Sequence, residues 1–171
     1  MNNDFLFKND IPIAKPIAFA EKRFASIIFE QALVFENLKN APRLKDYIDD
    51  LSTLQEKVIW MKKSIELAHL LHEKACYHLD FHHRNILFVN ENAHLIDNEK
   101  LVFCGQPRED LLAVMLGRLG FGLRDDISEQ AYYRAMAKPS KHRGIFYKAF
   151  EGKLSGKKLA AVISNHSFTK E

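Results

Sequence analysis

Apolar residues recur at three- and four-residue steps through the middle of the chain. Five positions share this spacing: Val58, Met61, Ile65, Ala68 and Leu71. The spacing places these residues on one face of an α-helix, and that face is expected to pack on the core. The pattern predicts a long helix over Thr53–Ala75 and a shorter one before it, over Arg43–Leu51.

Two extended segments are predicted near the start of the chain. Pro16–Ala20 and Ala25–Phe29 are apolar runs separated by the charged residues Glu21-Lys22-Arg23, which we expect to form a turn. The two segments would form a small antiparallel pair. The following residues, Gln31–Asn40, are expected to form an irregular crossover into the helices.

A second antiparallel hairpin is predicted from two apolar runs, Ile86–Val89 and Ala93–Ile96. The polar residues Asn90-Glu91-Asn92 between them suit a turn. We expect Ile86 to pair with Ile96. In the same antiparallel register, Asn85, which precedes Ile86, lies opposite Asp97, which follows Ile96.

Four helices are predicted after this hairpin: Arg108–Leu119, Ser128–Ala137, Ile145–Phe150 and Lys158–Ser164. The glycine-rich stretch Gly117–Gly122 follows a predicted helix rather than a strand. We therefore expect a helix-ending turn there and not a nucleotide-binding loop.

Length and composition indicate one globular domain. The chain has 171 residues, 47% of them hydrophobic and 13 of them Phe, which is enough for a substantial core. No apolar run is long enough to span a bilayer, and the first residues, Met1–Phe5, do not resemble a secretory signal. A cytoplasmic location is expected.

Cysteine and charge narrow the possible partners. Cys76 and Cys104 are too few for a disulfide framework or a cysteine-based zinc site. The net charge is only +3, but residues 101–171 carry 12 Lys and Arg against 7 Asp and Glu. This basic part could meet a phosphorylated substrate or an anionic membrane, but we favour a solvated face, because such mixtures of charge cover many ordinary helices. Its cations include Lys138, Lys141, Arg143, Lys148, Lys153, Lys157 and Lys158. No nucleic-acid recognition module is present.

The candidate chemistry lies in residues 78–97. His78-Leu79-Asp80 is followed after four residues by Asn85, and the predicted hairpin then ends at Asp97. This spacing is typical of a phosphoryl-transfer catalytic loop. Asp80 would accept the proton of an attacking hydroxyl, while Asn85 and Asp97 would bind Mg²⁺ on the phosphates of ATP.

Neighbouring residues have supporting or alternative roles. His78 is expected to brace the loop by hydrogen bonding, and Glu99 could add a carboxylate near the metal. A metal-dependent hydrolase is an alternative, because His78, Asp80, His82 and His83 crowd potential ligands together. That alternative leaves the spacing from Asn85 to Asp97 unexplained.

The order of elements resembles the later part of a protein-kinase-like fold. More narrowly, the chain resembles the bacterial lipopolysaccharide kinases that phosphorylate Kdo or core heptose. Three further segments support this resemblance: Ile11–Pro16, Leu70-Leu71-His72 and Arg108–Leu112. Aminoglycoside and choline-type kinases share the loop pattern. The short interval between Asp97 and Arg108 leaves little room for the activation segment of a protein kinase.

The chain departs from the kinase pattern before the catalytic loop. All 7 glycines lie at Gly105 or later, so no glycine-rich phosphate loop precedes it. Lys15 is a doubtful phosphate lysine because it precedes Pro16, and Lys22 falls in the predicted turn. Three interpretations remain open: an N-terminally truncated enzyme, an inactive pseudokinase that binds a ligand or partner, and a compact kinase with another phosphate clamp.

We therefore expect an α+β, protein-kinase-like single domain over residues 1–171, with residual N-lobe strands and hinge in residues 1–35 and a mostly helical C-lobe in residues 36–171. The resemblance implies ATP- and Mg²⁺-dependent phosphorylation of a sugar hydroxyl in a glycan or glycolipid of the lipopolysaccharide core. It also implies work at the cytoplasmic face of the inner membrane. A separate protein could supply the rest of the N-lobe.

Overall fold

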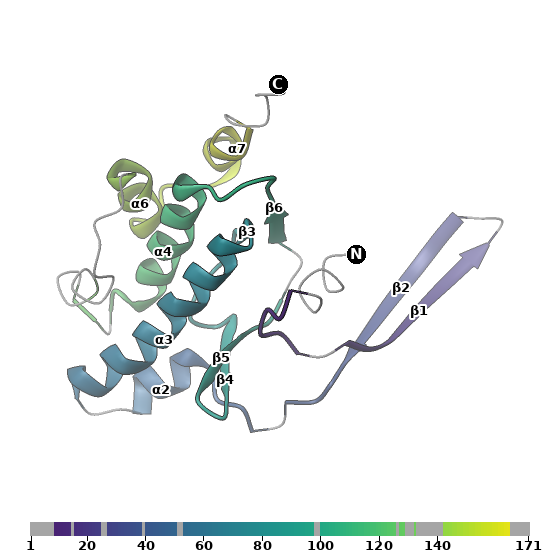
Figure 1. The fold of residues 1–171 in the computed structure, drawn as a ribbon, viewed down its shortest axis with the longest axis horizontal. Coiled ribbons are helices and arrows are strands. Elements are labelled where there is room, and N and C mark those ends of the chain that lie inside the picture. Colours follow the sequence, from purple (N-terminus) through teal and green to yellow (C-terminus); the bar gives the residue numbers. More distant parts are fainter. Residues whose placement is uncertain are drawn as a thin grey trace.

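The computed structural model describes residues 9–14, 16–24, 27–38, 40–50, 53–97, 100–125, 127–128, 132 and 142–164. Its architecture is α+β, as predicted, with helices packed together on one side and short strand pairs beside them (Figure 1). The described helices are α2 (Leu44–Asp50), α3 (Leu54–Glu73), α4 (Glu109–Leu123), α6 (Arg143–Phe150) and α7 (Gly156–Ser164). The strands are β1 (Pro16–Phe24), β2 (Ile27–Phe35), β3 (Cys76–His78), β4 (Ile86–Val89), β5 (Asn92–Leu95) and β6 (Leu101–Phe103).

Helix α3 confirms the strongest sequence prediction. Thr53 caps its first turn, and its hydroxyl accepts a hydrogen bond from the Glu56 backbone N–H while the Glu56 side chain returns to Thr53. Four of the five predicted face residues are buried, and Val58 packs against the same core at partial exposure. The predicted shorter helix is also present as α2.

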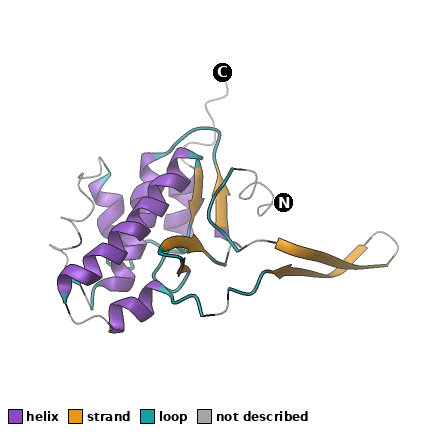
Figure 2. Cartoon of the chain, turned by 60° about the horizontal axis from the view of Figure 1, so that its bottom comes forward, coloured by secondary structure: helices purple, strands orange, loops and turns teal. Residues whose placement is uncertain are grey.

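The first strand pair projects away from the rest of the chain in both views (Figures 1 and 2). Strands β1 and β2 are antiparallel, as predicted, but the predicted turn is wrong. Glu21, Lys22 and Arg23 all lie inside β1, and Lys22 pairs with Glu30. Both strands are longer than the apolar runs suggested, because charged residues continue in the extended conformation. Lys15 lies outside the described residues.

The second hairpin is present, but its register differs by one residue from the prediction. Ile86 pairs with Leu95, and a two-residue turn joins the strands. Its residues Asn90 and Glu91 both have positive φ, of 47° and 64°, as a type I′ turn requires. With this register, Asn85 is opposite Ile96 and not Asp97, because the Ile96 N–H donates to the Asn85 carbonyl at 3.0 Å.

Strands β3 and β6 form an antiparallel pair that the apolar pattern did not indicate. Each has three residues, and His78 pairs with Leu101. Beyond the pair, the Leu79 N–H donates to the Lys100 carbonyl at 2.9 Å. The pairing fixes Lys100 and Leu101 beside the residues that begin the candidate catalytic loop.

Helix α4 is the most buried of the described helices and lies between α3 and α6 (Figure 1). The predicted helix-ending turn at Gly117–Gly122 is wrong, because α4 continues to Leu123. Its glycines allow close packing: a β-carbon at Gly117 would come within 2.5 Å of the Phe146 carbonyl oxygen of α6. Of the predicted helix Ser128–Ala137, only Ser128 and Tyr132 lie within the described residues.

One core connects these elements. It joins α2, α3, α4 and the short strands through buried side chains that include Tyr77, Phe81 and Leu111. Among the described helices, none is both long enough and apolar enough to cross a membrane. The β3–β4 connection, residues 79–85, contributes Phe81 to this core.

Candidate active site

The connection between β3 and β4 is anchored by buried side chains. Phe81 is fully buried in the core, and His83 and Asn85 are 8% exposed. Asp80 and His82, which directly precede Phe81 and His83, are only partly buried. Alternating anchored and accessible residues hold the loop in one shape while leaving the Asp80 carboxylate within reach of solvent.

A closed ring of hydrogen bonds joins the predicted site residues. His78 Nε2 bonds the Asp97 carbonyl at 2.6 Å, and the Asp80 N–H donates to His78 Nδ1 at 3.2 Å. The Asn85 side-chain N–H donates to the Asp80 carbonyl at 3.0 Å. The bond from the Ile96 N–H to the Asn85 carbonyl closes the ring through the Ile96–Asp97 peptide. The loop and the end of the second hairpin are therefore one unit.

His78 forms hydrogen bonds with two backbone groups of the site, those of Asp80 and Asp97. Because Nδ1 accepts a hydrogen bond from a backbone N–H, the imidazole proton is assigned to Nε2, which donates to the Asp97 carbonyl. Burial lowers the pKa of His78 below its usual value, against the opposing effects of the Asp97 carbonyl and the nearby carboxylates. The ring is neutral at pH 7 and serves as a fixed link.

The Asn85 amide is oriented by its bond to Asp80. Since the amide nitrogen is used on the Asp80 carbonyl, the amide oxygen is the atom left to act as a ligand. Its side chain is nearly buried, so little conformational freedom remains to be lost on binding. This is the donor type that a hard cation requires.

Asp97 has an unusual backbone conformation. Its φ is +59°, in the left-handed region, and its side chain is exposed although its carbonyl is held by His78. Glu99, the predicted additional carboxylate, lies outside the described residues.

Two cations hold the Asp80 carboxylate, and sequence reasoning identified neither. Lys100 Nζ lies 3.1 Å from Oδ2, and Arg118 Nη1 lies 3.4 Å from Oδ1. His82 Nε2 is 3.9 Å from Oδ2.

Partial burial raises the pKa of Asp80, but the Lys100 hydrogen bond and the neighbouring positive groups outweigh it. The net pKa is therefore below the ordinary value. Asp80 is ionised at pH 7, as a proton acceptor must be.

One face of α4 contacts the catalytic loop at three successive turns. The His78 N–H points to the sulfur of Met115 at 3.3 Å, Arg118 pairs with Asp80, and Gly122 lies against His83. Positions 115, 118 and 122 follow helical spacing, so they share a face. The four-residue spacing of Arg118 and Gly122 could have indicated this shared face. It was missed because the prediction ended the helix among its three glycines instead of continuing it to Leu123.

The histidines do not form a metal centre. Both ring nitrogens of His78 are hydrogen-bonded to backbone groups, and His82 Nδ1 accepts the Arg84 N–H at 3.1 Å. Over the part of the chain that is described, no group of three His, Cys, Asp or Glu side chains is arranged to hold a metal ion. The hydrolase alternative therefore has no preformed ligand set among these residues.

The donor types at Asn85 and Asp97 suit a magnesium ion whose other ligands come from a nucleotide. These residues would supply two oxygen ligands, and Mg²⁺ commonly takes one or two protein ligands with the remainder from phosphates and water. The small number of protein ligands agrees with a site completed by a nucleotide.

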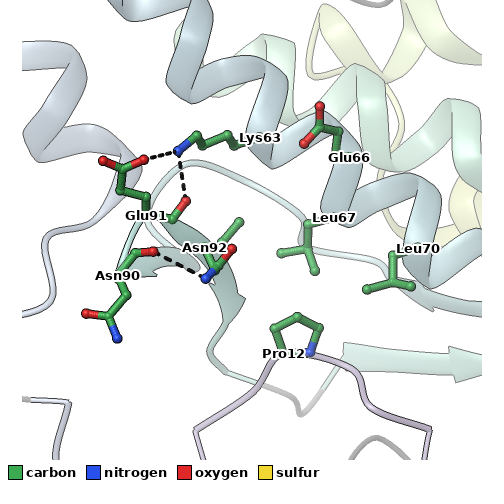
Figure 3. Close-up of a pocket in the computed structure, with 9 residues that line it drawn as sticks. Pro12, Lys63, Glu66, Leu67, Leu70, Asn90, Glu91 and Asn92 are labelled. Atoms are coloured by element: carbon green, nitrogen blue, oxygen red, sulfur yellow. Dashed lines mark hydrogen bonds and ion pairs between the residues drawn. The ribbon is translucent and has the colours of Figure 1, made fainter.

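A cavity of about 460 Å³ lies away from the catalytic loop, between α3, the β4–β5 turn and Pro12 (Figure 3). Leu67 and Leu70 of α3 contribute apolar surface, while Lys63 closes one end by pairing with Glu91 at 3.0 Å. None of the predicted site residues lines this cavity.

Comparisons with known proteins identify a family and a similar fold. A family model described as lipopolysaccharide kinase (Kdo/WaaP) matches residues 4–106. No curated protein matches the chain. Among solved structures, a chain titled "WaaP in complex with acyl carrier protein" has a TM-score of 0.67 at 14% identity, covering 88% of this chain and 71% of that one. This similarity shows a shared fold.

Proposed function

Since the chain belongs to the lipopolysaccharide kinase (Kdo/WaaP) family, we propose that it transfers the terminal phosphoryl group of ATP to a sugar hydroxyl of the lipopolysaccharide core, on Kdo or heptose. The hydrogen-bonded ring that joins Asp80, Asn85 and Asp97 is the observation that carries this proposal. It holds a proton acceptor and two candidate metal ligands in one rigid unit.

Each residue has a separate part in the proposed reaction. Asp80 takes the proton from the acceptor hydroxyl as its oxygen attacks the terminal phosphorus. The bond from that phosphorus to the bridging oxygen breaks, and ADP leaves. Asn85 and Asp97 hold Mg²⁺, which when bound neutralises charge on the phosphates. His78 holds the backbones of Asp80 and Asp97 at a fixed separation through its two hydrogen bonds.

The first test is magnesium-dependent ATP binding by calorimetry. Wild-type protein is expected to bind MgATP, and Asp97→Asn should weaken binding about tenfold or more, because it removes a charged metal ligand while leaving a residue that tolerates positive φ. Unchanged MgATP affinity in Asp97→Asn would remove Asp97 from the metal site.

The second test separates turnover from binding. Asp80→Asn should retain its fold and bind MgATP, yet lose transfer of labelled phosphate to core oligosaccharide by at least about a hundredfold, the scale of general base catalysis. Full transfer activity in this variant would reject Asp80 as the proton acceptor.

A non-catalytic pseudokinase is the second candidate function. The ion pairs of Asp80 support it, because both carboxylate oxygens face cations, Lys100 and Arg118. This candidate predicts ligand binding by wild-type protein without transfer to any core sugar under conditions in which a related active kinase turns over.

The acceptor leads to a proposal about location. A glycolipid substrate requires the enzyme at the inner membrane, and α6, α7 and their connection carry five exposed cations: Arg143, Lys148, Lys153, Lys157 and Lys158. Glu151 is the one acidic residue in 142–164, and it pairs with Lys153. We expect sedimentation with phosphatidylglycerol vesicles that falls with salt, and none with phosphatidylcholine vesicles.

A protein partner is the last part of the proposal. The hairpin β1–β2 projects from the body (Figure 2), and a separate polypeptide beside it would supply a phosphate-binding loop. The similar WaaP chain was solved with acyl carrier protein, so protein association occurs in that protein. Addition of such a polypeptide should increase MgATP affinity; unchanged affinity would argue against it.

A further inference from the structure

The two cations on Asp80 differ in how firmly they are held. Arg118 also donates to the Leu154 carbonyl at 2.9 Å, and only 24% of its side chain is exposed. The Lys100 side chain is 59% exposed, and Asp80 is its one ion-pair partner within the described part of the chain. Arg118 is therefore a fixed support, whereas Lys100 can exchange its partner.

The backbone of Lys100 is nevertheless fixed beside the site. Its carbonyl accepts the Leu79 N–H, and the next residue, Leu101, pairs with His78 in the β3–β6 pair. Lys100 also lies three positions after Asp97. A flexible side chain on a fixed backbone can reach different atoms of one site without any movement of the loop.

An incoming nucleotide changes the balance of charge around Lys100. The terminal phosphoryl group of ATP carries more negative charge than one carboxylate, and its oxygens are strong hydrogen-bond acceptors for an ammonium. Asp80, in turn, needs a free position on Oδ2 to meet the acceptor hydroxyl. Movement of Lys100 from Asp80 to the phosphoryl group satisfies both requirements together.

We propose that Lys100 is a catalytic residue that binds the transferred phosphoryl group and frees Asp80 Oδ2 for the acceptor. This inference rests on the proposed kinase function, and it assigns to Lys100 part of the charge neutralisation on the transferred phosphoryl group. Arg118 remains on Oδ1 throughout and positions the carboxylate.

The test compares MgATP with MgADP, because only MgATP has the terminal phosphoryl group. Calorimetry on Lys100→Met should show MgATP affinity reduced about tenfold, on the scale of one charge-assisted hydrogen bond, and MgADP affinity changed less than about twofold. Lys100→Arg keeps a cation and should retain most of the MgATP affinity. Lys62→Met removes an exposed lysine of α3 and should bind both nucleotides as wild type does.

The outcomes separate this inference from the function on which it rests. If wild-type protein binds neither nucleotide, the kinase proposal fails and the role of Lys100 fails with it. If wild type binds both and Lys100→Met weakens both equally or neither, only the role of Lys100 is overturned. Circular dichroism of each variant confirms that it is folded, and Lys100→Gln repeats the comparison with a polar replacement.

Discussion

Gly122 of α4 lies against the imidazole of His83, so closely that a β-carbon at position 122 would overlap the ring Nδ1. His83 is buried in the catalytic loop, three residues after Asp80. The absence of a side chain at one helical position thus sets how near the loop lies to α4. Arg118, one turn earlier on the same face, depends on that separation to reach Asp80.

Gly122→Ala should therefore impair the site. Alanine favours the helix by about 1 kcal/mol, but overpacking against His83 costs about 1–3 kcal/mol, so a modest net loss of stability is expected. The loop displacement should lower MgATP affinity, measured by calorimetry. Gly144→Ala is the matched control: position 144 has open space around it, so this variant should be at least as stable as wild type and bind normally. Equal behaviour of the two variants would show that the contact with His83 does not shape the site.

Arg108→Met should destabilise the C-terminal helices. Arg108 forms a bidentate pair with Asp110 and also donates to the Val162 and Ile163 carbonyls, which belong to the last turn of α7. Both charged side chains are about nine-tenths buried. Loss of this buried ion pair should cost about 3–5 kcal/mol in chemical denaturation.

Hydrogen exchange gives a local readout of the same variant. Amides of α7 should exchange faster in Arg108→Met than in wild type, because two carbonyl contacts that hold this helix are gone. Arg124→Met removes an exposed arginine and should change stability by less than about 1 kcal/mol. Unchanged exchange in α7 would contradict the proposed anchoring.

Stability should fall as the pH decreases below the ordinary histidine range. Burial lowers the pKa of His78 in the folded state, so the unfolded chain binds a proton first, starting near 6.5. The free energy contributed by neutral His78 is present above that pH and is lost as the pH falls toward the folded-state pKa. Burial also lowers the pKa of His82, which acts in the same direction.

Urea unfolding between about pH 7.5 and pH 5.5 checks this expectation, because carboxylates titrate mainly at lower pH. His78→Gln should be less stable at the upper end, since its hydrogen bonds are altered, but its decline with acid should be shallower. A decline as steep as that of wild type would mean that another group causes it.

In the β4–β5 turn, the cost of positive φ at Glu91 can be compared with the stabilisation from its ion pair with Lys63. Glu91 has φ of 64°, which glycine adopts without cost, whereas its pair with Lys63 is exposed and worth at most about 1 kcal/mol. Lys63 also bonds the Glu91 carbonyl, and that contact needs no side chain. Thermal unfolding should rank Glu91→Gly at or above wild type, and Glu91→Val about 1–2 kcal/mol below it. Glu91→Val as stable as wild type would contradict the assigned turn.

Local sequence patterns predicted the parts of the fold that local physics determines. The α3 face and the Thr53 start follow from helical spacing and a capping box, both within a few residues. The register of the second hairpin was missed because three polar residues suggested a longer turn. In the structure, Asn90 and Glu91 alone make the turn by adopting positive φ, and a one-residue difference changes which residue lies opposite Asn85.

Contacts between distant segments could not be predicted in the same way. Strands β3 and β6 have three residues each, too short to show a period, and their pairing depends on how the intervening hairpin folds. Lys100 and Arg118 lie 20 and 38 positions from Asp80 and meet it only through that pairing and through α4. The roles predicted for Asp80, Asn85 and Asp97 remain predictions, although the ring of hydrogen bonds now joins them.

The left-handed backbone at Asp97 limits how a mutational survey of this position can be interpreted. Glycine, asparagine and aspartate are the residues that adopt such a φ at least cost, and the last two also carry oxygen donors. A library selected for folding in magnesium-free medium should retain all three, whereas selection for nucleotide binding should retain aspartate alone. Only the difference between the two selections would report on coordination, because tolerance at this position alone reflects main-chain geometry.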